Sequence, residues 1–326
     1  MRVACHRFRP PYVATNLSTS RPLDRSPPKR QLRSASPPLL QDLAGFSRHF
    51  LSPHPPATLS ALLKPILFHL GTFPIHTFGL LVALGFVFGL WAASRNARRA
   101  GLDPELPYDL APWLIGGGLI GARMLYVASY WQKDFAGQPI SEVFAIWKGG
   151  LVFYGGLIGA TLAGIIALKR RGSPLWKVAD CLAPGIALGH VFGRTGCLLN
   201  GCCFGRSSSA AWAVRYPEGH STFPALVHPA QVYEALLNLA FFGALTWLHR
   251  RRKFDGLVFA SYLVGYAFIR SFAELFRGDY DVVSKPSSGV FTPGQTTSLL
   301  ILATGLALLF VLRGAGRPKI PEPASR

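Results

Sequence analysis

Seven apolar stretches, separated by short polar segments, dominate this chain of 326 residues. Each stretch is roughly 17–21 residues long, which is close to the length that an α-helix needs to cross about 30 Å of hydrocarbon. The stretches are 75–93, 110–130, 151–168, 175–192, 232–248, 257–276 and 296–312. Half of all residues are hydrophobic and only 15% are charged, which excludes an ordinary soluble domain. The sequence therefore predicts an all-α polytopic membrane protein with about seven transmembrane helices.

Basic clusters follow every second apolar stretch. They are Arg95, Arg98 and Arg99 after the first stretch, Lys169, Arg170 and Arg171 after the third, Arg250, Arg251, Arg252 and Lys253 after the fifth, and Arg313, Arg317 and Lys319 after the seventh. The positive-inside rule places all four clusters in the cytoplasm. We therefore expect the first helix to begin outside the cell and the tail at 314–326 to lie in the cytoplasm.

Residues 1–60 differ from the rest of the chain, because they are rich in Arg, Pro and Ser and nearly lack acidic residues. This composition predicts a disordered basic extension. Such a segment should resist export, yet the topology places it outside. The alternative is that the true start codon lies downstream and the extension is never made. In either case, we expect a membrane domain at 61–313 with an outer loop at 194–228.

The net charge of +19 needs no nucleic acid to explain it, because basic loops suit contact with anionic lipid head groups. Three of the five cysteines cluster at Cys197, Cys202 and Cys203. Their spacing matches no zinc framework, because paired C-x-x-C motifs are absent. Although His190 could join them as a ligand, we expect no metal here. Buried or reactive thiols, or a disulfide, are the favoured interpretations.

Ionisable residues inside membrane spans are costly, so they are functional candidates. The predicted helices carry Arg123, Arg194, Arg270, Glu274 and Arg277. The last three are spaced by four and three residues, which predicts one shared helix face. One glutamate cannot neutralise four arginines, so the surplus charge predicts a bound anion such as a phosphate ester. The alternative for Glu274 is an ion network that only fixes helix packing.

A glycine-rich segment, GHVFGRTGCLLNGCCFG at 189–205, places Arg194 at the end of an apolar stretch. Glycines leave backbone amides open to close approach by a ligand, and the planar guanidinium of an arginine suits a phosphate. We therefore expect a phosphorylated lipid to be held here.

Two further segments carry candidate polar groups. KGGLVFYGGLIG at 148–159 surrounds Tyr154 with glycines, which indicates either tight helix packing or a cavity lined by the tyrosine hydroxyl. HPAQVYEALL at 228–237 adds His228, Gln231 and Glu234 at the start of a helix. His228 is either a base or a helix cap, and spacing alone does not decide between them.

Together these motifs resemble the prolipoprotein diacylglyceryl transferase family. GRTGCLLNGCCFG resembles the family signature G-R-x-G-N-F-x-N-x-E. The resemblance extends through IHTFGLLVALGF at 75–86, GARMLY at 121–126, KGGLVFYGGLIG, HPAQVYEALL, GYAFIRSFAELFRGD at 265–279 and PGQTTSLL at 293–300. The order and spacing of these motifs hold over about residues 65–312.

The resemblance implies transfer of the diacylglyceryl group of phosphatidylglycerol to the lipobox cysteine thiol of a prolipoprotein, with release of glycerol phosphate. It implies a seven-helix enzyme of the bacterial cytoplasmic membrane that needs no cofactor. The expected partners are phosphatidylglycerol, a prolipoprotein signal peptide and the bilayer, without nucleic acid. A catalytically inactive lipid-binding relative and an anionic-solute transporter are the alternatives.

The resemblance also assigns roles to residues. Arg194 matches the arginine that binds phosphatidylglycerol, and Arg270 matches another arginine important for activity. We predict a catalytic set of Tyr154, Arg270 and Glu274, a phosphatidylglycerol-binding set of Arg194, Arg123, Arg277, Gly205 and Asn200, and a supporting set of His228, Gln231, Cys197 and Cys202.

Four positions depart from the pattern of the family. Tyr154 stands where many members have a histidine proposed as catalytic, and Phe78 replaces a tyrosine. Cys197 replaces the asparagine of the signature, and Cys202 replaces its glutamate. These changes put in doubt any mechanism with a histidine base at that position. Our hypothesis is that Tyr154 either orients the substrate or acts as the base.

Overall fold

The computed structural model describes residues 65–71, 73–278 and 293–315. Each of the seven predicted stretches lies in or largely within one long helix. The helices are α3 (Thr77–Arg99), α4 (Leu106–Tyr130), α6 (Phe153–Arg170), α7 (Leu175–Asn200), α8 (Ala230–Arg250), α9 (Leu257–Phe276) and α10 (Pro293–Ala315). The predicted extension at 1–60 and most of the predicted tail lie outside the described residues.

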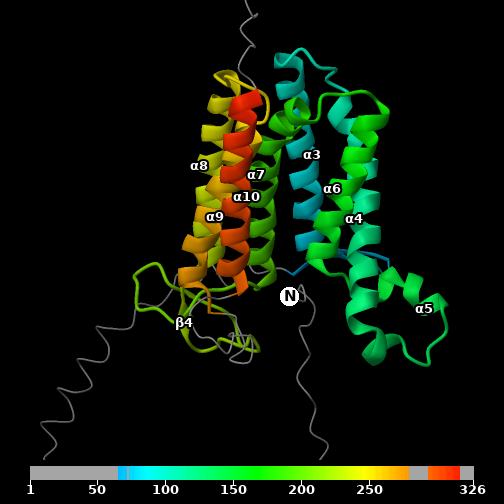
Figure 1. Cartoon of the computed structure of the whole chain (residues 1–326). Coiled ribbons are helices and arrows are strands. Elements are labelled where there is room, and N and C mark those ends of the chain that lie inside the picture. Colours follow the sequence, from blue (N-terminus) through cyan, green and yellow to red (C-terminus); the bar gives the residue numbers. More distant parts are fainter. Residues whose placement is uncertain (1–64, 72, 279–292, 316–326) are drawn as a thin grey trace, which may run out of the picture.

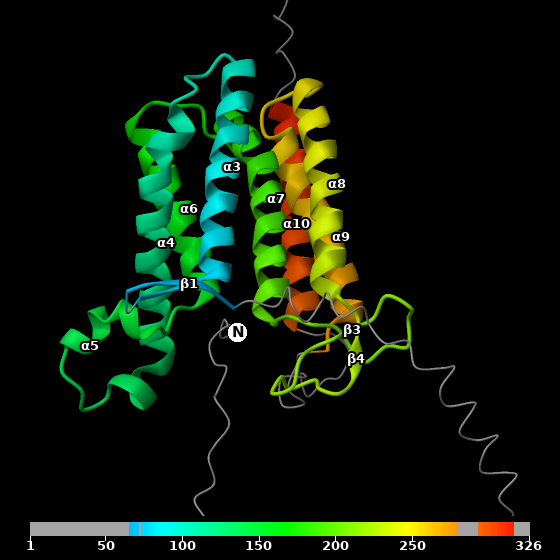
Figure 2. The same cartoon turned by 180° about the vertical axis from the view of Figure 1, so that it is seen from behind.

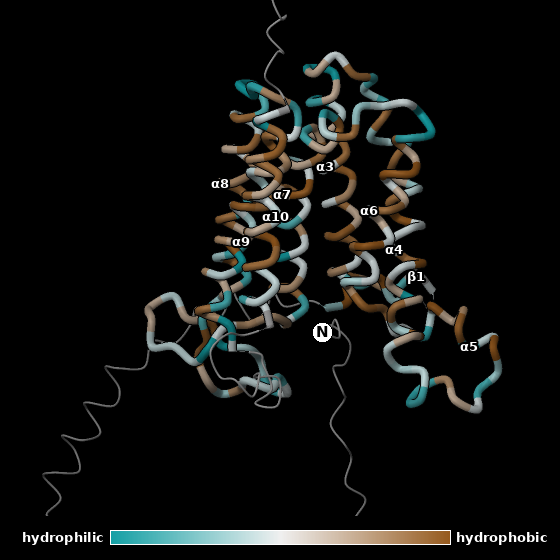
Figure 3. The backbone as a smooth tube through the Cα atoms, viewed as in Figure 1, coloured by the Kyte–Doolittle hydropathy of each residue, from teal (hydrophilic) through white to brown (hydrophobic). Residues whose placement is uncertain are grey.

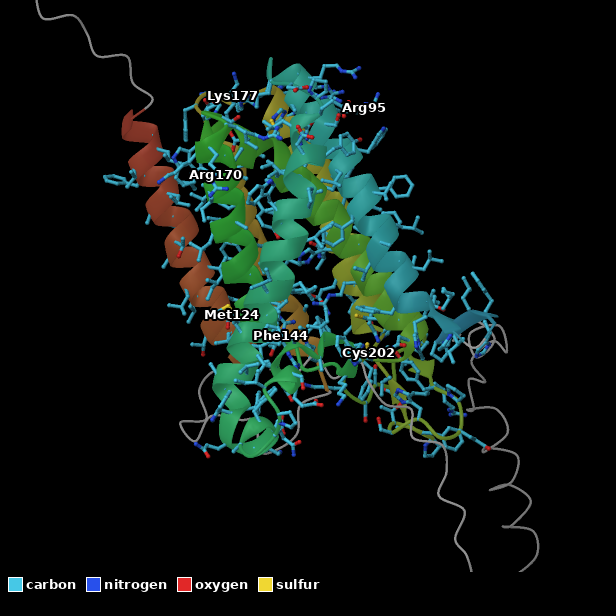
Figure 4. All side chains as sticks on the ribbon, turned by 90° about the vertical axis from the view of Figure 1, so that its right-hand side faces the viewer. Arg95, Met124, Phe144, Arg170, Lys177 and Cys202 are labelled. Atoms are coloured by element: carbon cyan, nitrogen blue, oxygen red, sulfur yellow. The ribbon has the colours of Figure 1, made fainter. Side chains whose placement is uncertain are left out.

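The long helices run side by side in two groups, with α3, α4 and α6 on one side and α7 to α10 on the other (Figures 1 and 2). Helix α3 packs along α7 and joins the groups. The basic ends of α3 and α6 lie at the same end of the bundle, as the labels of Arg95 and Arg170 show, while Cys202 lies toward the other end (Figure 4). The basic clusters that follow the first and third apolar stretches therefore lie at one end of the bundle.

Apolar residues dominate the helix shafts, and hydrophilic residues concentrate near the ends of the bundle (Figure 3). Four helical segments are long and apolar enough to cross a membrane, namely Thr77–Arg99, Leu106–Phe135, Leu257–Phe276 and Gly294–Gly314. Helices α6, α7 and α8 are not among them, and α7 and α8 carry the buried acidic residues Asp180 and Glu234. The chain is thus mostly helical with several candidate spans, and the count of seven spans stays a prediction.

Glycines bring α4 and α6 close together. A Cβ added to Gly121 of α4 would lie 2.3 Å from the carbonyl oxygen of Gly155 in α6, and one added to Gly159 would lie 2.2 Å from that of Gly117. Only hydrogen fits at such contacts, as in small-residue packing between membrane helices. The glycines after Tyr154 therefore serve close packing of α4 against α6, which is the first of the two alternatives for this motif.

Short elements depart from a purely helical fold. β1 (Ile66–Leu70) and β2 (Phe73–His76) form an antiparallel hairpin before α3, and β3 (Val214–Arg215) pairs with β4 (Leu226–Val227) in the segment between α7 and α8. Three short helical segments, η1 (Trp131–Phe135), α5 (Ser141–Phe144) and η2 (Ile146–Lys148), connect α4 to α6. Hydropathy could not predict these elements, because each is far shorter than a membrane span.

Candidate active site

Two arginines and two glutamates form an ion network between α7, α8 and α9. Nε of Arg194 lies 3.0 Å from Oε2 of Glu234, and Nη1 of Arg270 lies 3.9 Å from Oε1 of the same carboxylate. Nη2 of Arg270 lies 2.7 Å from Oε2 of Glu274, one helical turn further along α9. Glu234 therefore connects the two arginines that the sequence analysis placed in separate sets.

The network is buried, but not evenly. The side chains of Glu274 and Glu234 are 0% and 4% exposed, that of Arg270 is 10% exposed, and that of Arg194 is 17% exposed. Arg194 is thus the member that a ligand could reach first. Within this network two formal positive charges are matched by two negative ones. The surplus of positive charge over all four arginines stays a prediction.

The charged network has close neighbours on several helices. A Cβ added to Gly294 in the first turn of α10 would lie 2.7 Å from the carboxylate oxygens of Glu274. The rings of His190 and Tyr266 meet edge to face with centroids 5.1 Å apart. Tyr266 lies within electrostatic range of both arginines and of Tyr154. These contacts enclose the network from α7, α9 and α10.

Tyr154 lies in the first turn of α6, so it belongs to the other helix group. Its hydroxyl forms a 2.9 Å hydrogen bond with Oγ1 of Thr297 in α10. Because Tyr154 also lies within electrostatic range of Tyr266, the structure brings this predicted catalytic residue toward the Arg270 region. The catalytic role of Tyr154 stays a prediction.

Arg277 does not share a helix face with Arg270 and Glu274, contrary to the prediction. Helix α9 ends at Phe276, and Arg277 is in an extended conformation with φ −67° and ψ 138°. It forms a β-bridge with Gly205. The helical periodicity used for the prediction fails here because the chain leaves the helix one residue earlier.

Gly205 lies where three segments meet. A Cβ there would come 2.6 Å from the Cβ of His228 and 2.9 Å from the carbonyl oxygen of Phe276. The amide of Gly205 donates to the carbonyl of His228 at 2.9 Å. Nδ1 of His228 forms a 3.1 Å hydrogen bond with the Tyr233 hydroxyl. Glycine is thus needed for close packing, and ligand binding by Gly205 stays a prediction.

Arg123 lies apart from the ion network and is held by backbone carbonyls. Its Nε donates to the Val143 carbonyl at 2.7 Å, and its Nη2 donates to the Glu142 carbonyl at 2.6 Å. Its Nη1 donates to the carbonyls of Gly149 at 2.8 Å and Gly150 at 3.1 Å. This geometry favours a structural role in the segment between α4 and α6. The prediction that Arg123 binds phosphatidylglycerol stays untested.

Three thiols meet beside Arg194. The Sγ atoms of Cys197, Cys202 and Cys203 all lie within 4.8 Å of one another. Asn200 joins this group, because its Nδ2 donates to Sγ of Cys202 at 3.8 Å. A hydrogen bond with Cys197 raises the pKa of the Cys203 thiol to about 11. The sequence analysis noted this cluster of cysteines, and the structure shows that all three side chains converge.

The segment between α7 and α8 packs over the thiols through a second set of polar contacts. Nε2 of Gln231 donates to the Cys202 carbonyl at 2.7 Å and to the Tyr216 hydroxyl at 2.9 Å. Tyr216 stacks on His220 with ring centroids 4.2 Å apart. Burial raises the pKa of Tyr216 to about 12. Gln231 therefore links the Cys202 backbone to Tyr216, and its supporting role in activity stays a prediction.

Comparisons with known proteins identify the family of the chain. The family model for prolipoprotein diacylglyceryl transferase matches residues 65–311. The chain belongs to the prolipoprotein diacylglyceryl transferase family. The match covers every residue of the ion network and all of the long helices except the last four residues of α10, so membership rests on nearly the whole membrane part of the chain.

Individual members of the family show how similar the chain is. The phosphatidylglycerol–prolipoprotein diacylglyceryl transferase of Synechococcus elongatus is 34% identical over 272 residues, which cover 80% of this chain and 92% of that protein. The proteins of the same name from Geobacillus kaustophilus and Rhizobium meliloti are 33% and 34% identical. These alignments cover 79% and 78% of this chain, and 95% and 93% of the respective relatives.

Sequence reasoning missed three members of the site. Glu234 was noted only as a polar group, and Tyr266 and Thr297 only as parts of motifs. A buried acid on α8 could have been suspected, because an arginine inside the membrane needs a counter-charge. No sequence signal identifies which acid on which helix supplies it.

Proposed function

We propose that this chain transfers the diacylglyceryl group of phosphatidylglycerol to the lipobox cysteine of a prolipoprotein. The observation that carries the proposal is Arg194, which stands in the family signature and is the most exposed member of the buried ion network. The names of the relatives supply the two substrates. The alternatives of an inactive relative or an anion transporter have no comparable support.

In this proposal Arg194 and Arg270 bind the phosphate of the lipid. Attack of the acceptor sulfur on the glyceryl carbon breaks the carbon–oxygen bond to phosphate, and negative charge develops on the departing glycerol phosphate. Guanidinium groups fixed in advance by Glu234 and Glu274 stabilise that charge without reorganising. The network thus supplies positioned donors, while its carboxylates hold the guanidinium groups in place.

The proposal includes a topology. The chain crosses the bacterial cytoplasmic membrane seven times, with the first helix beginning outside and the basic end of the bundle in the cytoplasm. The site would then lie toward the outer face, where the signal peptide of a prolipoprotein presents its lipobox. The polarity of the bundle supports this orientation.

The test is a transfer assay with purified protein in phosphatidylglycerol liposomes, in which the mass of a lipobox peptide is measured. Replacement of Arg194 by Ala should lower the rate at least 100-fold, which is typical for loss of a charge-stabilising donor. Replacement of Arg250 by Ala is the matched control, because this exposed arginine lies at the end of α8. Activity near the original level in the Arg194 variant would disprove the phosphate-binding assignment.

A second variant tests Tyr154, which we propose orients the substrate. Tyr154→Phe keeps the ring and removes the hydroxyl bonded to Thr297. For a residue that only orients the substrate, we expect the transfer rate to fall about tenfold. Removal of a general base would lower it at least 100-fold. The rate of the liposome assay at saturating lipid distinguishes these cases. Unchanged activity would exclude Tyr154 from the reaction.

A further inference from the structure

We propose that Arg99, His249 and Arg252 bind a phosphate group at the end of the bundle opposite the ion network. The phosphate is carried either by an anionic lipid of the adjacent leaflet or by a soluble phosphate compound. Such a site is separate from the proposed transfer reaction and does not depend on it. In the proposed topology, this end of the bundle lies at the cytoplasmic face of the membrane.

An open cavity of about 350 Å³ lies at this end of the bundle, a volume within the range of ligand pockets. It is lined by Arg99, His249, Arg250 and Arg252. Arg99 ends α3, whereas His249 and Arg250 end α8. Because an α-helix rises about 1.5 Å per residue, Glu234 of the ion network and His249 lie about 22 Å apart along α8. The cavity is therefore distinct from the candidate active site.

The wall of the cavity is basic. Three arginines line it, and within the described part of the chain no acidic side chain does. Oδ1 of Asp255 lies 3.7 Å from Nε of Arg252, but the Asp255 side chain is 50% exposed, so this pair contributes little. The buried carboxylate of Asp180 accepts hydrogen bonds of 2.8 Å and 2.9 Å from two backbone amides at the start of α9. Against three arginines, these two acids leave an excess of positive charge.

His249 carries a buried hydrogen-bond donor that lacks an acceptor. Its Nε2 accepts a hydrogen bond of 2.5 Å from Nη1 of Arg252, because a guanidinium group only donates. A neutral imidazole then carries its hydrogen on Nδ1. This Nδ1 is buried and has no hydrogen-bond partner among the residues that the structure describes. Leaving a buried donor unpaired is costly, and a phosphate oxygen would supply the missing acceptor.

Packing among α3, α7 and α8 fixes the side chains at the base of the cavity. Sγ of Cys181, on α7, lies 3.6 Å from Nε2 of His249. Nδ2 of Asn96, on α3, donates to the carbonyl of Cys181 at 3.3 Å. His249 is 4% exposed, and the Arg252 side chain is 14% exposed. The imidazole and the Arg252 guanidinium are therefore ordered before a ligand arrives, which lowers the entropic cost of binding.

A purely structural role accounts for only part of this arrangement. Cations at the C-terminus of a helix interact favourably with the helix dipole, which suffices to explain Arg250 as the last residue of α8. Arg252 lies beyond α8, and both Arg99 and Arg252 lie within electrostatic range of His249. Basic pockets between membrane helices on the cytoplasmic side are typical sites for anionic lipid head groups. The shared cavity and the unpaired nitrogen of His249 therefore favour a bound phosphate.

The first experiment compares two neighbouring arginines. Arg99→Gln removes one charge from the cavity. Arg98→Gln is the matched control, because Arg98 is equally part of the exposed last turn of α3 but does not line the cavity. The delipidated full chain is titrated in an uncharged detergent with dihexanoyl phosphatidic acid, and binding is measured by calorimetry. We expect the affinity of one site to fall about tenfold or more in Arg99→Gln and less than about twofold in Arg98→Gln.

Two further titrations identify the source of the phosphate and the position of the site. A lipid site should bind phosphatidic acid about tenfold or more tightly than inorganic phosphate, because the acyl chains add buried apolar area. A site for soluble phosphate should bind both with similar affinity. Arg194→Ala removes the proposed phosphate ligand of the candidate active site. The component that depends on Arg99 should keep its affinity in this variant.

The second experiment locates the ligand at His249. Nuclear magnetic resonance of the chain with ¹⁵N-labelled histidine reports whether Nδ1 is hydrogen-bonded, and the signal that is missing in His249→Gln belongs to this residue. Phosphatidic acid should shift the signal in the original chain and in Arg98→Gln. At the same lipid concentration it should shift the signal much less in Arg99→Gln. Thermal unfolding of each variant checks that it is folded.

Two results would overturn the proposal. Equal loss of affinity in Arg98→Gln and Arg99→Gln would show that the whole basic surface attracts the lipid without a defined site. Saturable binding that leaves the Nδ1 signal of His249 unchanged would place the phosphate elsewhere. The second result is obtained on the original chain, so it does not depend on how well any cavity variant folds.

Discussion

Arg123 and Arg194 differ in the groups that pair with their guanidinium groups. Arg123, on α4, donates to four backbone carbonyls of residues 142–150, so its neighbours are neutral and fixed by the local chain. Arg194, on α7, is paired with Glu234 of α8, whose other oxygen faces Arg270 of α9. The first arginine fastens a connecting segment, whereas the second belongs to a network that joins three helices.

The difference indicates which buried arginine can exchange its partner for a ligand. Carbonyls held by a loop cannot follow a guanidinium that turns toward a phosphate, so ligand binding by Arg123 would leave several of them unsatisfied. A carboxylate shared by two arginines can keep one while the other binds an anion. The glycine contacts of α4 with α6 fit the same division, since that region is built for rigid packing.

The largest expected effect on transfer and stability comes from a substitution of Glu234. It disrupts the ion network between α7, α8 and α9 and leaves the contacts of Arg123 unchanged. Glu234→Gln deprives two buried guanidinium groups of a shared charge, which typically costs 3–5 kcal/mol when a buried pair is broken. We expect transfer to fall about 100-fold or more and the unfolding temperature to fall with it.

The control for this prediction is Glu142→Gln in the other region. Glu142 pairs with Lys148 at 2.7 Å, but the two side chains are 32% and 59% exposed, so the pair contributes less than about 1 kcal/mol. Both quantities are measured in the same liposome assay and by thermal unfolding in detergent. Equal losses in the two variants would remove the distinction between the regions.

An intermediate effect is expected for Arg123→Lys. An ammonium group cannot donate in a fork to four carbonyls, so the variant should lose about 2–4 kcal/mol of stability. The KM for phosphatidylglycerol should stay unchanged, in contrast to Arg194→Lys, which should raise it. Titration of the lipid in mixed vesicles measures the KM of both variants. A raised KM with unaltered stability would instead support lipid binding by Arg123.

The smallest effect concerns Tyr216, which covers the thiols beside the α7–α9 network. Burial raises its pKa in the folded chain to about 12 from an ordinary value near 10. Both states hold the proton below pH 10, so the contribution of Tyr216 to stability is complete there. Between pH 10 and pH 12 the unfolded state loses the proton first, and stability decreases as pH rises.

Tyr216→Phe removes this dependence together with the hydrogen bond from Gln231. At pH 8 the variant should be less stable by about 1 kcal/mol, and the difference should shrink by a similar amount at pH 11. Thermal unfolding of the original chain and the variant at both pH values measures it. A difference independent of pH would show that Tyr216 ionises normally in the folded chain.

The sequence by itself determined where the long helices lie, because their signal is local. An apolar run of sufficient length forms a helix whatever its neighbours, and each predicted stretch lies in or largely within one of α3, α4, α6, α7, α8, α9 and α10. Basic residues at the ends of alternate helices also fixed the polarity of the bundle. The motifs that identify the family are likewise short and contiguous, so they suffice to select Arg194 and Arg270 as candidate site residues.

Only the tertiary structure decided how the polar side chains pair. Glu234 meets two arginines from other helices, three cysteines meet across a strained turn, and Arg277 leaves its helix for a bridge with Gly205. Each outcome depends on the rotation of one helix against another or on a single backbone angle. Hydropathy and residue spacing predict neither of these. The energies of such contacts are large because the surroundings exclude water, so a few long-range pairings determine which of several plausible residues form the site.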